Sequence, residues 1–248
     1  MKKPAVETAA HHHETMRAPP ASSSFSEFAA HLGRLMRDHP VIRAVNFHNT
    51  PRNRRDEYRQ QFALLAKEFA PVTENDLNAF LLTGRWRKNR PGVIVALYEG
   101  YRNGYDVILP LLEEFRLVGW FFVITDFVKT PPGAQLEFAK AHDIGMETRE
   151  YGGGRYALSW SELRQIDRHH VIASHARSHL GLATLDDAAL ESEVLGSQRD
   201  FHEHLGHPVR SFVSYGGPAY GEHPHVDALI DRANYQFVFS NFRIQRLR

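Results

Sequence analysis

Apolar residues in this chain fall into two kinds of pattern, continuous runs and repeats at helical spacing. Continuous runs of strand length predict strands at 41–48, 92–98, 119–125, 170–174, 209–213 and 236–239. Apolar residues that recur every third or fourth position predict helices at 25–37, 55–69, 75–82, 107–115, 134–141, 159–168, 185–204 and 226–233. Strands that alternate with helices at this separation form right-handed crossovers, so the pattern predicts a parallel sheet in one α/β barrel or doubly wound fold.

Two helix starts carry capping patterns. Ser159 is followed three places later by Glu162, and Thr184 is followed by Asp187 at the start of the predicted helix 185–204. No domain boundary is evident after residue 40, so we expect one α/β domain over residues 25–248.

Residues 1–24 are rich in Ala, Pro, Ser and His, which indicates a flexible N-terminal segment. They contain no apolar stretch of the kind that forms a signal peptide or a membrane span. The sequence therefore predicts no membrane span and a cytoplasmic location. It gives no indication of the oligomeric state.

Composition narrows the chemistry. The 248 residues include no Cys, which excludes thiolate catalysis and zinc–sulfur sites. Lys and Arg number 30 against 29 Asp and Glu, a net charge of +1, so no overall field attracts a polyanion and we expect no nucleic-acid partner.

Three loops follow predicted strands and carry polar or titratable side chains. They contain the sequences YEGY at 98–101, SHARSH at 174–179 and SYGGP at 214–218. The carboxyl ends of parallel strands meet at one edge of a sheet, so these loops are expected to lie together. Glu99, His175 and His179 offer one carboxylate and two imidazoles, the ligand set of an open divalent-metal site. His175 and His179 are four residues apart, and on one helical turn they would point the same way.

The same loops resemble the motifs of the polysaccharide deacetylase family, the carbohydrate esterases with a NodB homology domain. The sequence ALYEGY at 96–101 stands where that family has Thr-Phe-Asp-Asp-Gly-Tyr, so the first motif is degenerate. HARSH at 175–179 is similar to the family's His-Ser/Thr-x-x-His motif, and VSYG at 213–216 is similar to Tyr-Pro-Tyr-Gly. The order of these motifs extends the resemblance over about residues 41–248.

The resemblance implies a distorted (β/α) barrel and a hydrolase that removes acetyl groups from an N- or O-acetylated sugar or surface polysaccharide. It further implies a divalent metal, usually zinc, held by Glu99, His175 and His179. Tyr98 stands in the place of the general base, and the backbone N–H of Tyr215 corresponds to an oxyanion-hole donor.

The sequence also departs from the family at catalytic positions. The pKa of a tyrosine is ordinarily about 10, so Tyr98 is a poor substitute for an aspartate base. Ser214 replaces the family's proline, and no Leu-x-x-His segment, the usual source of the general acid, precedes Arg248. His48 and His223 are candidates for proton transfer by their loop positions.

Three functions therefore remain open from sequence. The first is a metal-dependent carbohydrate deacetylase with a modified base. The second is a catalytically degenerate deacetylase-like domain that binds a glycan or a protein partner without turnover. The third is a metal-independent amidohydrolase in which Glu99 is a catalytic group.

Overall fold

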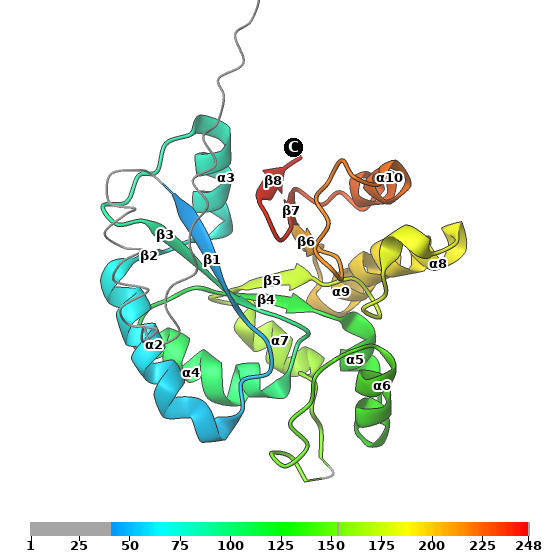
Figure 1. The fold of residues 1–248 in the computed structure, drawn as a ribbon, viewed down its shortest axis with the longest axis horizontal. Coiled ribbons are helices and arrows are strands. Elements are labelled where there is room, and N and C mark those ends of the chain that lie inside the picture. Colours follow the sequence, from blue (N-terminus) through cyan, green and yellow to red (C-terminus); the bar gives the residue numbers. More distant parts are fainter. Residues whose placement is uncertain (1–40, 153, 248) are drawn as a thin grey trace, which may run out of the picture.

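A computed structural model describes residues 41–152 and 154–247 (Figure 1). The segment 1–24 and the helix expected at 25–37 lie outside the described residues. All the described strands belong to one sheet, in the order β1-β3-β4-β5-β6-β7-β8, with β2 paired to β3. The strands are β1 Ile42–Phe47, β2 Ala70–Pro71, β3 Gly92–Leu97, β4 Gly119–Val123, β5 Val171–Ser174, β6 Ser211–Val213, β7 Phe237–Phe239 and β8 Ile244–Arg246.

The sheet is parallel from β1 to β7 and curls into part of a barrel (Figure 1). Strand β8 returns antiparallel to β7, so β1 and β8 form the two ends of the curled sheet. The expected distorted (β/α) barrel is confirmed. The expectation that 236–239 is the last strand is wrong, because β8 follows it. The sequence of β8 is short and polar, and it has no apolar run to mark it.

Most of the helices cover the outer face of the sheet, whereas the helix at 74–83 packs through Leu77 against its inner face (Figure 1). The helices are α2 Arg55–Glu68, α3 Glu74–Thr83, α4 Leu109–Glu114, α5 Thr125–Lys129, α6 Gln135–Ala141, α7 Trp160–Ile166, α8 Asp187–Glu191, α9 Ser197–Leu205 and α10 Pro224–Arg232. Short 3₁₀ turns η1 Arg52–Arg54, η3 Pro132–Ala134 and η4 Leu182–Thr184 and the π turns η2 Gly104–Ile108 and η5 Ser192–Gly196 complete the set.

The helix caps agree in part with the sequence. Ser159 and Glu162 form the expected capping box of α7. The helix expected at 185–204 is instead divided into α8, η5 and α9, and its N-cap is Asp186 rather than Thr184. Asp186 is the N-cap of α8 because its carboxylate accepts the backbone N–H of Ala189 at 2.8 Å.

Side chains of each strand alternate between two apolar clusters. Val93, Val95 and Leu97 face the surrounding helices, whereas Ile94 and Ala96 face the inside of the barrel. Tyr98 continues the inward series and packs at the edge of the inner cluster. Because side chains alternate along a strand with a period of two residues, Tyr98 faces the opening of the barrel at the carboxyl ends of the strands.

Within residues 41–152 and 154–247, no helix is both long and apolar enough to cross a membrane.

Candidate metal and acyl-transfer site

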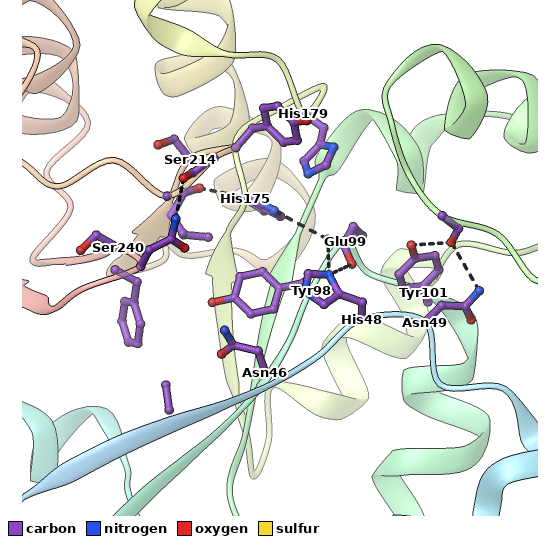
Figure 2. A pocket seen from close by; sticks show the side chains of 18 of the residues that line it. Asn46, His48, Asn49, Tyr98, Glu99, Tyr101, His175, His179, Ser214 and Ser240 are labelled. Carbon is purple, nitrogen blue, oxygen red and sulfur yellow. Dashed lines mark hydrogen bonds and ion pairs between the residues drawn. The ribbon is translucent and has the colours of Figure 1, made fainter. Parts of the chain in front are cut away.

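A cavity of about 960 Å³ opens at the carboxyl ends of the strands. His48 follows β1, Glu99 follows β3, His175 follows β5 and Tyr215 follows β6, and all four line this cavity (Figure 2). The loops that the sequence analysis selected therefore do lie together, because parallel strands bring their carboxyl ends to one edge.

Glu99, His175 and His179 form a buried cluster in the wall of the cavity. One ligand atom from each lies within 4.8 Å of the others, and His175 Nε2 is 3.9 Å from Glu99 Oε1. Glu99 has a φ of 65°, a left-handed conformation that is uncommon for a residue with a side chain. This backbone geometry turns its carboxylate toward the two imidazoles (Figure 2).

Both imidazoles of the cluster are oriented by backbone carbonyls. His175 Nδ1 donates to the carbonyl of Val213 at 3.2 Å, and His179 Nδ1 donates to the carbonyl of His142 at 2.7 Å. Each Nε2 is then left with its lone pair, as a metal ligand requires. Burial lowers the pKa of His175 to about 3, which keeps this ring neutral at physiological pH. Two imidazoles with unbonded Nε2 atoms and a carboxylate in this arrangement fit a divalent transition-metal ion.

The segment that joins the two histidines is a tight turn, so the expected helical turn is wrong. Ala176 and His179 have positive φ angles of 59° and 68°, which no α-helix contains. The buried Glu193 carboxylate accepts the backbone N–H groups of Arg177 and Ser178 at 3.1 and 2.9 Å. It also accepts the Ser178 hydroxyl. The i, i+4 spacing brings the rings together through this turn, with centroids 4.8 Å apart.

His48 is hydrogen-bonded to the carboxylate of the cluster. Its Nδ1 lies 2.8 and 3.0 Å from the two Glu99 oxygens (Figure 2). A carboxylate only accepts, so Nδ1 carries the proton and Nε2 of the neutral ring is a free acceptor. The hydrogen bond to Glu99 raises the pKa of His48, and partial burial opposes this shift. Sequence reasoning chose His48 by its loop position, but the pairing with Glu99 follows from the parallel register of Phe47 with Leu97.

Tyr98 is held between two rings at the bottom of the cavity. It stacks on His48 at 5.1 Å and on Phe122 at 5.0 Å, with His175 edge-on at 5.5 Å. Burial is the main cause that raises the pKa of Tyr98 to about 12. The hydroxyl is therefore protonated at neutral pH.

Tyr215 lies beside His179 on the loop after β6. The two rings are 4.5 Å apart, and the Tyr215 hydroxyl donates to Asp143 at 2.8 Å. Residues 142 and 143 thus contact both His179 and Tyr215, a link that sequence reasoning missed. His223, the other candidate for proton transfer, precedes α10 and is not among the described residues that line the cavity.

A curled parallel sheet whose polar groups gather at its carboxyl edge is the arrangement of (β/α)-barrel enzymes. Residues 87–237, more than half of the chain, match the family model described as polysaccharide deacetylase. The chain therefore belongs to the polysaccharide deacetylase family. Among curated protein sequences, none matches it.

Solved structures share the fold at low sequence identity. A Streptococcus pyogenes deacetylase, PplD in complex with acetate, has a TM-score of 0.61 and 14% identity over 84% of this chain and 86% of its own. IcaB from Ammonifex degensii has a TM-score of 0.59 and 18% identity over 81% and 84%. The deacetylase domain of BpsB from Bordetella bronchiseptica has a TM-score of 0.55 and 16% identity over 81% and 87%.

Proposed function

We propose that this protein is a metal-dependent hydrolase that removes acetyl groups from an N- or O-acetylated sugar or surface polysaccharide. The observation that carries the proposal is the cluster of Glu99, His175 and His179, whose ligand atoms lie within 4.8 Å of one another in a large open cavity. Both histidines already have their Nδ1 atoms bound to carbonyls, which leaves both Nε2 atoms for a ligand.

These three side chains would hold a divalent cation, and two imidazole nitrogens with one carboxylate oxygen suit zinc. Such a cation supplies Lewis acidity, which polarises an acyl carbonyl and makes water more acidic. Tyr215, beside His179, would direct its backbone N–H toward the acyl oxygen and stabilise the charge that develops there.

His48 is the residue that we assign to proton transfer. Its Nε2 is a free acceptor when the ring is neutral, and its Nδ1 hydrogen bond to Glu99 fixes the plane of the ring. Tyr98 occupies the position of the family's base but keeps its own proton. We therefore assign Tyr98 a packing role, in which its stacking contact at 5.1 Å supports His48.

A second candidate function is glycan or protein binding without turnover. The observation that favours it is Tyr98 itself, a protonated side chain at the position where the family has a base. A third candidate, metal-independent amide hydrolysis, would use Glu99 as a catalytic group instead of a ligand.

Metal content and acetate release separate these three functions. We expect purified wild-type protein to bind about one equivalent of zinc or a similar ion per chain, and His175→Ala to lose it. His202→Ala, which removes an exposed imidazole from α9, is the matched control and should keep the metal. Acetate release from an acetylated oligosaccharide that chelation abolishes and zinc restores supports the deacetylase. Metal binding without acetate release identifies the binding domain, and acetate release that survives chelation identifies the metal-free hydrolase.

A further inference from the structure

Phe242 is an exposed aromatic side chain on the rim of the same cavity. It is 85% exposed, the largest value among the large apolar side chains of the described residues. Single exposed apolar residues are common on proteins, so exposure alone indicates nothing. What distinguishes Phe242 is the structure that supports it and its place in the cavity wall.

The turn between β7 and β8 that carries Phe242 is braced internally. The Ser240 hydroxyl donates to the carbonyl of Arg243 at 2.9 Å. The same oxygen accepts the backbone N–H groups of Phe242 and Arg243 at 3.3 and 3.1 Å. Every bond of this set constrains the backbone at Phe242, so a ligand would not have to order this turn.

The turn is also tied to the loop that carries Tyr215. Asn241 donates through its side chain to the carbonyl of Gly216 at 2.8 Å and through its backbone to the carbonyl of Gly217 at 3.0 Å. Gly217 has a φ of 60°, and a Cβ there would lie 2.6 Å from Asn241 Oδ1. The close approach therefore requires glycine, and it fixes the position of Phe242 relative to the catalytic loops.

The cavity extends well beyond the buried cluster. Ser240 lies on the far side of the Tyr98 ring from Glu99, and Asn46 of β1 lies below that ring in the same view (Figure 2). Ala44 and Asn46 of β1 are exposed and line the cavity, since no strand of the described residues pairs with the outer side of β1. A volume of about 960 Å³ is at the upper end of the roughly 300–1,000 Å³ typical of ligand sites, enough for more than one sugar unit.

We propose that Phe242 is a sugar-stacking platform for a unit of the glycan other than the one that carries the reacting acetyl group. The inference rests on the proposed function, because it assumes that the acetyl group lies at the buried cluster. Sugar rings present C–H faces, which pack on the electron-rich face of an aromatic ring. A platform separated from the cluster makes no contact with a single sugar bound there, so it selects oligomers and polymers over monosaccharides.

The test measures binding as a function of chain length, independently of turnover. Calorimetry would use the metal-depleted full chain with N-acetylglucosamine oligomers of one to six units, in β-1,4 and β-1,6 linkage. We expect wild-type affinity to rise with length. Phe242→Ala should weaken binding of the hexamer by about 10-fold, the loss expected for one buried aromatic contact, and leave the monomer unchanged. Phe242→Trp should retain hexamer binding.

Leu82→Ala is the matched control, because Leu82 is another exposed apolar side chain, 56% exposed on α3, and does not line the cavity. It should change nothing. Affinity that does not rise with length in the wild type overturns the proposal. Equal hexamer affinity in wild type and Phe242→Ala also overturns it, as does an equal loss for monomer and hexamer. If acetate release is absent but the length-dependent loss occurs, the deacetylase function fails and the stacking platform stands.

Discussion

At the scale of single residues, we propose that His48 has the proton-transfer role that the family motif gives to position 98. The inward register of β3 places position 98 at the opening of the barrel, but the half-buried tyrosine there is stacked between His48 and Phe122. Its pKa of about 12 excludes proton acceptance near neutral pH. The neighbouring strand β1 supplies an imidazole next to the same carboxylate, so a proton acceptor is still available at the site.

His48→Asn and Tyr98→Phe test this assignment. Asn keeps a donor near the position of Nδ1 for Glu99 but has no basic nitrogen, so kcat should fall by about 100- to 10,000-fold, while Tyr98→Phe should change kcat by less than about threefold. Metal content and melting temperature of both variants should equal those of the wild type. A large loss of kcat in Tyr98→Phe with little loss in His48→Asn would reverse the assignment.

The sequence predicted the members of the site better than their contacts. Glu99, His175 and His179 were predicted because residue type, spacing and position after an apolar run can all be read from short stretches of the sequence. The bond from His48 to Glu99 spans 51 residues, and the carbonyl of His142 is 37 residues from His179. These contacts depend on strand register and on the course of the loop that follows α6, neither of which a local pattern contains.

At the scale of elements, the turn that carries both histidines is held by the broken helix behind it. Glu193 lies in η5, where the helix widens to π geometry, and its carboxylate accepts two N–H groups of the turn. The turn contains two residues with positive φ, a conformation that costs free energy and persists only where surrounding contacts fix it. Sequence periodicity predicted one continuous helix here, because a single π turn shifts the apolar repeat by only one position.

Glu193→Gln is expected to loosen the metal site without unfolding the protein. Both N–H groups bond the same carboxylate oxygen, so Gln can hold them on its amide oxygen, but a neutral acceptor makes weaker hydrogen bonds than a carboxylate. Metal affinity should therefore fall by about 10-fold, the lower end of the usual effect of losing an outer-shell partner. Competition with a chelator measures this affinity, and chemical denaturation of the metal-free protein measures stability separately.

Glu191→Gln is the control, because Glu191 lies in α8 two residues earlier and forms a surface ion pair with Arg232 at 3.5 Å. Its metal affinity should equal that of the wild type. If Glu193→Gln binds metal as tightly as Glu191→Gln, the turn does not need the Glu193 carboxylate.

At the scale of the whole molecule, the alternation of strands and helices predicted the fold class. It did not predict how far the sheet closes into a barrel. Buried parallel strands such as β3 and β4 are entirely apolar and therefore visible. In the part of the chain that the structure describes, the end strands β1 and β8 each pair on one side alone. Strand β8 is partly exposed throughout, so no apolar run reveals it. The cavity is lined by residues of both end strands, so it depends on the sheet's remaining open between β1 and β8.

Acid stability of the whole fold depends in part on His170, at the opposite edge of the sheet from the cavity. Its Nδ1 accepts the backbone N–H of Gly119 at 3.1 Å, where β4 begins, and burial lowers its pKa to about 4. In the unfolded chain the pKa of histidine is about 6.5. Between pH 6.5 and 4 the unfolded state therefore binds a proton that the native state does not, and the free energy of unfolding must fall as the pH falls. Below pH 4 both states are protonated and this contribution stops changing.

His170→Asn removes the titration and keeps an acceptor for Gly119. Chemical denaturation at pH 7.5, 6, 5 and 4.5 should show the free energy of unfolding of the wild type falling more steeply than that of the variant. Other titrating groups, the candidate metal ligands included, contribute equally to both curves, so the difference between the curves isolates His170. His225→Asn, at an exposed position in α10, should follow the wild type. Parallel curves for wild type and His170→Asn would show that His170 keeps an ordinary pKa in the folded protein, and that the contact with Gly119 does not oppose its protonation.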